Sequence, residues 1–198
     1  MRGVIQLRGE RVLLRPFRLE EVDDVWAARE AEQGPWVGTR NAFARRLAQS
    51  GKFVGGRLDL AIEADGQLVG ELDARHADRF VPPGVWELGI MLFGDARRGR
   101  GYGTEAVALL ADYLFREAGA GRVQATTAVG NEPMRRVLEK TGFTYEGTLR
   151  GFMPAGAGRE DYALYAITRD DWPSIVGRRP QSAQLDPSPE EGGDPPFA

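Results

Sequence analysis

Hydrophobic and polar residues in the first half of the chain follow two different periods. The run at 11–17, RVLLRPF, is short, apolar and closed by a proline, which predicts a strand. Residues 19–29 predict a helix, because apolar side chains recur there at helical spacing, at Val22, Val25 and Trp26. A second helix is expected soon afterwards, with Asn41 as its N-cap. Residues 56–75 alternate on both sides of Asp65-Gly66, which predicts a β-hairpin.

The second half of the chain alternates strands with helices. Residues 85–93, VWELGIMLF, predict a central strand, and 104–119 predict a helix that is apolar on most sides. Further elements are expected at 122–129 (strand), 133–142 (short helix), 143–150 (strand) and 160–168 (last strand). The predicted order is β α α β β β α β α β β, with no internal repeat. It indicates an α/β fold with seven strands.

The length and the end of the chain indicate how these elements are organised. A chain of 198 residues fits one domain, which we expect to span 1–177. Residues 178–198 are rich in proline, glycine and acidic residues and show no period. This composition is typical of a disordered tail.

Composition and charge exclude several classes of function. The chain has no cysteine and a single histidine, His76, which excludes a disulfide scaffold, a cysteine nucleophile and a multi-histidine metal centre, so no metal site is expected. A net charge of −3 argues against a nucleic-acid partner. No signal peptide or apolar run of membrane-spanning length is found, so we expect a cytoplasmic protein without a membrane partner.

One short stretch combines glycine, positive charge and a helix start. RRGRGYGTEA, residues 97–106, follows the predicted strand at 85–93 and opens the helix behind it. Free amides at a helix start and close backbone approach at glycine make such a loop an anion site. A Walker loop is excluded because no lysine precedes Thr104.

A dinucleotide site is the closest alternative for this loop, because Gly101, Gly103 and Ala106 fit G-x-G-x-x-A. Two observations argue against it. The following strand at 122–129 carries no acidic residue to hold a ribose, and the loop lies behind an antiparallel hairpin in the middle of the chain.

The same residues resemble a known enzyme family. Residues 98–103, RGRGYG, fit the [QR]-x-x-G-x-[GA] loop of the GNAT superfamily of acyl-CoA-dependent N-acetyltransferases. The stretches WELGIML, GYGTEAVALLADYLF, NEPMRRVLEKTGF, YEGTLRG and GREDYALY resemble, in order and spacing, its Rim-type branch. That branch includes ribosomal-protein N-terminal acetyltransferases. The resemblance runs from about residue 7 to about residue 172.

The resemblance implies acetyl-CoA as the cofactor. It also implies the GNAT fold, a mixed, mostly antiparallel sheet of seven strands that is flanked by helices and splays between its fourth and fifth strands, 85–92 and 122–129. The amides of 98–103 and the Thr104 hydroxyl would hold the pyrophosphate, and the pantetheine arm would lie in the splay. Asn131 is the family position that contacts this arm, although a turn or cap residue would look the same. The implied cofactor-binding residues are Ile90, Met91, Leu92, Arg97, Arg98, Gly99, Arg100, Gly101, Tyr102, Gly103, Thr104, Asn131 and Met134.

Glu87 is the candidate catalytic residue. It is the acid within an otherwise apolar strand beside the implied acetyl site, and the Rim-type branch often carries glutamate there. It would act as a general base on the acceptor amine. His76 is an alternative base, although it lies in a charged stretch that is typical of a surface connection. A carboxylate in a structural ion pair would also explain Glu87.

The sequence departs from the family pattern at the residues that would protonate the leaving thiolate. Met134 and Leu138 occupy the positions at which the branch and other GNAT enzymes place a serine and a tyrosine, and neither side chain can donate a proton. Tyr162, Tyr165 or water could replace the missing acid. Loss of the acid would slow such an enzyme without silencing it.

The acceptor is expected to be a primary amine, with a protein or peptide N-terminus as the first hypothesis. Implied substrate-binding residues are Trp26, Trp36, Glu87 and Asp161, of which Asp161 could instead anchor a loop through backbone hydrogen bonds. A polyamine or aminoglycoside acceptor is the enzymatic alternative. A catalytically weak acyl-CoA-binding module is the alternative from another class. The family also makes a homodimer an expected partner arrangement.

Overall fold

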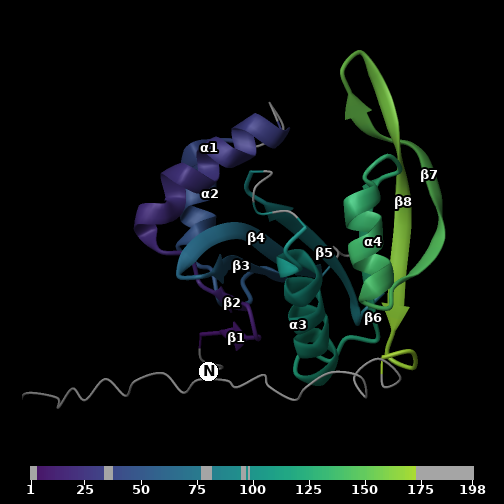
Figure 1. Ribbon diagram of the computed structural model, residues 1–198, viewed down its shortest axis with the longest axis horizontal. Helices are drawn as coiled ribbons and strands as arrows, with labels where there is room; N and C mark the ends of the chain where they lie inside the picture. The colour runs from purple at the N-terminus through teal and green to yellow at the C-terminus, as the bar shows by residue number, and fades with distance from the viewer. Residues whose placement is uncertain (1–3, 34–37, 77–81, 95–96, 98, 173–198) are drawn as a thin grey trace, which may run out of the picture.

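The computed structural model describes residues 4–33, 38–76, 82–94, 97 and 99–172 (Figure 1). The predicted tail at 178–198 lies outside these residues. Within them, no helix is long and apolar enough to cross a membrane.

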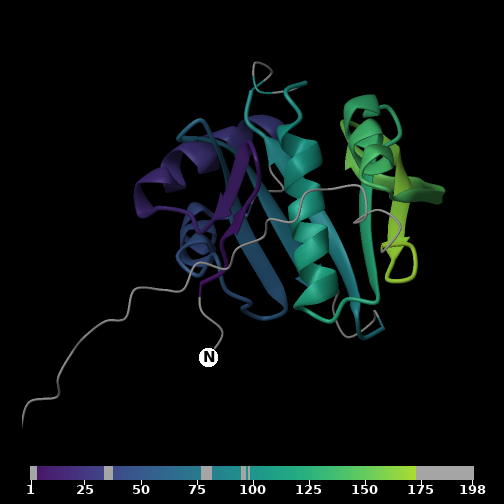
Figure 2. The same ribbon diagram turned by 60° about the horizontal axis from the view of Figure 1, so that its bottom comes forward.

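The described elements form one eight-stranded sheet flanked by helices (Figures 1 and 2). Its strand order is β1-β2-β3-β4-β5-β6-β8-β7, and every pair is antiparallel except β5 with β6. The strands are β1 (Leu7–Arg8), β2 (Val12–Arg15), β3 (Arg57–Ala64), β4 (Gln67–His76), β5 (Val85–Leu92), β6 (Arg122–Ala128), β7 (Thr144–Ala155) and β8 (Gly158–Thr168). The helices are η1 (Leu19–Glu21), α1 (Val22–Gln33), α2 (Arg40–Leu47), α3 (Tyr102–Arg116) and α4 (Glu132–Lys140).

This architecture confirms the predicted mixed, mostly antiparallel fold and corrects two details. The sheet has eight strands and not seven, because β1 contributes two residues, too few to show an alternating pattern. Thr39, and not Asn41, caps α2, since its hydroxyl accepts a hydrogen bond from the Ala42 amide at 3.3 Å. The turn at Asp65-Gly66 is confirmed, with φ of 52° and 73° at its two residues.

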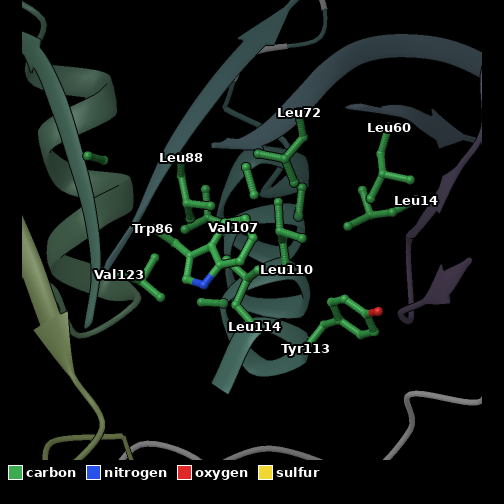
Figure 3. Close-up of a cluster of buried hydrophobic side chains, with 14 of the residues drawn as sticks. Leu14, Leu60, Leu72, Trp86, Leu88, Val107, Leu110, Tyr113, Leu114 and Val123 are labelled. Atoms are coloured by element: carbon green, nitrogen blue, oxygen red, sulfur yellow. The ribbon is translucent and has the colours of Figure 1, made fainter. Parts of the chain in front are cut away.

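One face of the sheet carries the apolar core. Side chains on alternate positions of β3, β4 and β5 point to this face, where α3 covers them (Figure 3). Fully or nearly fully buried residues of this cluster include Leu60, Leu72, Trp86, Leu88, Val107, Leu110 and Leu114. Burial of this cluster fixes α3, and with it the glycine-rich loop before α3, against the sheet.

The opposite face of the same strands is charged, and α1 and α2 cover it. Arg29 of α1 pairs with Glu71 of β4 at 2.6 Å, and Arg46 of α2 approaches Asp59 of β3 at 3.4 Å. Burial raises the pKa of Glu71, although the neighbouring Arg29 acts in the other direction. The two faces of one sheet therefore have opposite character, apolar under α3 and ionic under α1 and α2.

Close packing of β4 against β5 depends on Gly70. A Cβ atom on Gly70 would lie 2.4 Å from the carbonyl oxygen of Met91 and 2.9 Å from a methyl carbon of Leu92. Gly70→Ala should lower the free energy of unfolding by about 1–3 kcal/mol, because the two strands must move apart. Urea denaturation measures this change. Gly130→Ala is the control, since a Cβ there meets nothing within 4 Å, and equal stability of the two variants would contradict the packing argument.

Candidate active site at the parting of β5 and β6

The neighbouring strands β5 and β6 pair at one end and then separate. Val85–Glu87 pair in parallel with Arg122–Gln124, and within these two described strands no pair follows Glu87 and Gln124. On its other edge β6 pairs with β8 from end to end. The predicted splay is thus confirmed. Beyond Glu87, the β5 backbone edge that faces β6 can pair with an extended ligand.

The N-terminus of α3 is the second part of the site. Gly99 and Gly101 have φ of 76° and 85°, in the left-handed region that glycine adopts without strain. Gly101 is the N-cap and has no side chain to satisfy the first amides of the helix. The first helical hydrogen bond runs from the Glu105 amide to the Gly101 carbonyl at 3.1 Å. The amides of the first turn are therefore available to an anion.

Gly103 connects this helix start to the parting of the strands. A Cβ atom on Gly103 would lie 3.7 Å from Ile90 and Leu92 of β5 and 3.8 Å from Val137 of α4. These are ordinary van der Waals distances, so Gly103 packs closely between β5 and α4, and a side chain larger than a methyl group would crowd both. Figure 2 shows α3 between the N-terminal strands and the group formed by α4, β7 and β8.

Side chains of the predicted loop have partners that the sequence did not reveal. Arg97 donates to the carbonyl of Leu68, so its guanidinium ties the loop to β4. Tyr102 is buried and donates its hydroxyl hydrogen to Asp65 at 3.0 Å, which leaves its backbone amide as the group available to a ligand. Arg98 lies outside the described residues. Arg100 is exposed, and its carbonyl is held by another residue of the chain.

That residue is Arg11, which sequence reasoning missed. Its Nη1 donates to the Arg100 carbonyl at 3.1 Å, and its backbone amide donates to Glu105 of α3 at 3.0 Å. Arg11 therefore clasps the loop and the first turn of the helix together. Such a contact joins residues far apart in the sequence, and no local pattern indicates it.

Asn131 and Met134 lie at the start of α4. The Asn131 side chain accepts a hydrogen bond from the Met134 amide at 3.2 Å, which confirms its alternative role as a helix cap. Met134 is half-buried against the apolar core, and Leu138 is fully buried. Neither position presents a proton donor, as the sequence predicts.

Glu87 lies at the last paired position before the strands separate. Its Oε1 accepts a hydrogen bond from Arg75 Nη2 at 3.0 Å, and its Oε2 lies 3.5 Å from the amide nitrogen of Gln124. The side chain is 28% exposed, so a ligand in the parting can reach it. The sequence places Glu87 in an apolar strand, but the buried apolar residues beside it, Trp86 and Leu88, point to the other face of β5. The side chain of Glu87 itself has polar neighbours.

The other proton-transfer candidates have partners away from this point. His76 packs edge-on against Trp86, with ring centroids 5.1 Å apart, and its Nε2 accepts from the Gly84 amide at 3.4 Å. The Tyr165 hydroxyl is buried, donates to Glu139 at 3.0 Å and accepts from Arg135 at 3.1 Å.

Tyr162 of β8 packs against Phe152, with ring centroids 5.6 Å apart. Its pKa is raised by partial burial and by the charge of Glu160. A raised pKa keeps the phenol protonated, but no described contact joins it to Glu87.

The predicted substrate residues lie apart from one another in the fold. Trp26 of α1 packs on Phe43 of α2, with ring centroids 5.5 Å apart, and so joins the two helices. Asp161 accepts a hydrogen bond from the Gly151 amide at 2.6 Å, which confirms the expected anchoring of the β7–β8 hairpin. Trp36 lies outside the described residues.

Comparison with known proteins agrees with this geometry. Residues 11–144 match the sequence profile of the acetyltransferase (GNAT) domain. The Bacillus subtilis protein named "Putative ribosomal N-acetyltransferase YdaF" is 31% identical over 111 residues, which cover 54% of this chain and 57% of YdaF. The chain spans between 42% and 62% of the length of YdaF and three further Bacillus subtilis relatives, all named as N-acetyltransferases.

Two solved structures share the fold. Mycobacterium smegmatis RimJ in complex with CoA-disulfide is 27% identical, with a TM-score of 0.71 over 86% of this chain and 88% of RimJ. RimL, a ribosomal L7/L12 alpha-N-protein acetyltransferase in complex with coenzyme A, also has a TM-score of 0.71, over 84% of this chain and 99% of RimL. At 15% identity the RimL likeness concerns the fold alone.

Proposed function

The chain belongs to the acetyltransferase (GNAT) family, and we propose that it transfers an acetyl group from acetyl-CoA to a primary amine, the N-terminal α-amine of a protein or peptide. One observation carries this proposal: β5 and β6 part directly after Glu87, beside the glycine-rich start of α3. The parting offers a backbone edge, the helix start offers free amides, and Glu87 offers a carboxylate at the point where the two strands separate.

The residues around the parting fit acetyl-CoA. Amides at Gly99–Thr104, with the Thr104 hydroxyl, would hold the pyrophosphate at the positive end of the α3 dipole. The β5 backbone at 88–92 would pair with the pantetheine arm where β5 and β6 part. When bound, the cofactor supplies a thioester carbonyl and a thiolate leaving group. The RimJ complex with CoA-disulfide supports this assignment.

Glu87 would take the proton that the attacking amine loses, directly or through one water molecule. A chain α-amine with a pKa of about 8 is roughly one-tenth neutral at pH 7, so a modest base is sufficient. No acid at Met134 or Leu138 is needed for slow turnover. A thiol pKa of about 8.5 puts unassisted thiolate departure about 2 kcal/mol from neutrality.

The charge balance of the ionic face favours a single amine over a polycation. Among the described residues there, the four acids Asp59, Glu71, Asp73 and Glu87 face four arginines, Arg29, Arg46, Arg57 and Arg75. A polyamine or aminoglycoside would gain little from a balanced surface, whereas an α-amine needs one carboxylate. The name of YdaF agrees with this choice.

Gly103→Val should abolish detectable binding of acetyl-CoA in isothermal titration, because its γ-methyl groups would crowd Ile90, Leu92 and Val137 and displace the first turn of α3. Valine can adopt the helical backbone conformation of this position, and circular dichroism checks that the variant is folded. Gly130→Val is the control, because a Cβ there meets no atom within 4 Å. Undiminished binding by a folded Gly103→Val variant would remove the cofactor from this position.

Glu87→Gln should lower kcat by about 100-fold near neutral pH, the size of effect that a general base supplies, and should leave the Kd for acetyl-CoA unchanged. Thioester consumption at saturating acceptor measures kcat. Glu132→Gln, an exposed carboxylate on α4, is the control. A normal kcat in the Glu87→Gln enzyme would end its assignment as the base.

An acceptor panel separates the proposed substrate from the alternatives. We expect turnover with peptides that begin with Ser, Ala or Thr and at least tenfold less with spermidine or kanamycin. The reverse preference would identify a small-amine acetyltransferase. Tight acetyl-CoA binding without turnover on any amine would identify an acyl-CoA-binding module.

A further inference from the structure

A row of charged side chains crosses the ionic face of the sheet and ends at Glu87. Arg57 of β3, Arg75 of β4 and Glu87 of β5 are register partners across adjacent strands. Asp73 links the first two, because its Oδ1 lies 3.1 Å from Arg57 and its Oδ2 lies 3.4 Å from Arg75. The Nη2 of Arg75 then reaches Glu87 at 3.0 Å. Arg75 is thus the residue through which the row holds the carboxylate.

Gly89 has no side chain, which allows Asp73 and Arg75 to pack closely against β5. Gly89 is the register partner of Asp73, and a Cβ there would lie 2.8 Å from Asp73 Oδ1 and 3.5 Å from Arg75 Nη2. Asp73 is buried, and burial raises its pKa, while Arg75 and Arg57 act in the other direction. Since a buried carboxylate without a cation is costly, Asp73 fixes Arg75 in place.

Gln124 holds Glu87 from the other side of the parting. Arg122 donates its Nε hydrogen to Gln124 Oε1 at 3.1 Å. Because arginine has donors and no acceptor, this contact requires the Gln124 oxygen to face Arg122 and its NH2 group to face Glu87. Glu146 of β7 in turn pairs with Arg122 through both of its oxygens. Both oxygens of Glu87 therefore face donors.

We propose that Arg75 is a positioning residue for the reaction: it fixes the Glu87 carboxylate, in its ionised form, at the parting of β5 and β6. The inference rests on the proposed function, in which Glu87 is the base. One hydrogen bond to each oxygen leaves further lone pairs directed at the incoming amine or its water. A freely rotating carboxylate would spend less time in that geometry.

Several other charged groups lie on the same face of the sheet. They are Asp73 and Glu71 on β4, Arg57 and Asp59 on β3, Arg122 on β6, Arg29 from α1 and Arg46 from α2. Arg75 differs from all of them, because it is the cation in direct contact with Glu87 among the described residues. Its removal should therefore act on Glu87 more strongly than removal of any other arginine.

The test compares Arg75→Gln with Arg75→Lys in the enzyme. Arg75→Gln should lower kcat about tenfold, the size of one hydrogen bond to a charged group, with an unchanged KM for acetyl-CoA. Arg75→Lys keeps a cation that can donate a hydrogen bond to the Glu87 carboxylate, and it should restore most of the wild-type kcat.

Arg46→Gln is the matched control, because it removes an equal charge from the same face of the sheet and its ion-pair partner is Asp59, not Asp73 or Glu87. It should lower the melting temperature and keep the wild-type kcat. A wild-type kcat in Arg75→Gln would overturn the inference and show an ion pair of purely structural value.

Failure of the proposed function gives a different pattern. Wild-type enzyme without turnover on any amine, or full activity in Glu87→Gln, would remove the reaction or its base, and the inference with it.

Discussion

The site depends on one break in an otherwise continuous ladder of backbone hydrogen bonds. β5 and β6 pair through Glu87 and Gln124 and then part, whereas β4 keeps its pairing with β5 from Trp86 to Leu92. A sheet can leave such an edge open only where other packing supports both strands. Here β8 supports β6, and α3 supports β5 through the apolar cluster of Leu88 and its neighbours.

The two faces of the sheet have different roles. Burial of apolar side chains under α3 supplies most of the stabilising free energy and places the glycine-rich helix start beside the parting. The ionic face stabilises less, because desolvation of buried charges offsets much of their attraction. Its arginines and carboxylates instead set the positions of side chains across β3, β4 and β5. Glu87 lies where this ionic face meets the parting.

Local sequence patterns correctly predicted the features that depend on residues close together in the chain. Alternation gave the β3–β4 hairpin, the positive φ of Gly66 fitted its turn, and the glycines before α3 marked the anion loop. Thr39 and Asn41 are both capping residue types two positions apart, so sequence alone could not decide between them.

The sequence did not predict contacts between residues that lie far apart in the chain. Arg11 contacts the loop before α3, although 89 positions separate it from Arg100 in the sequence. Arg75 contacts Glu87 because the two residues are register partners on β4 and β5. In the sequence, Glu87 is flanked by apolar residues of the same strand. Its contacts in the fold come from the neighbouring strands β4 and β6, which a pattern along one strand does not show. The family resemblance supplied the splay, which no pattern within 85–92 or 122–129 indicates.

The measurement that tests the central claim most directly is amide-resolved hydrogen exchange with and without acetyl-CoA. The account predicts slower exchange at two places, the β5 edge at 88–92 and the helix start at 99–104, with little change along β7. Protection at both would show the cofactor lying in the parting with its pyrophosphate on α3. Unchanged exchange at these two segments under saturating acetyl-CoA would contradict the account.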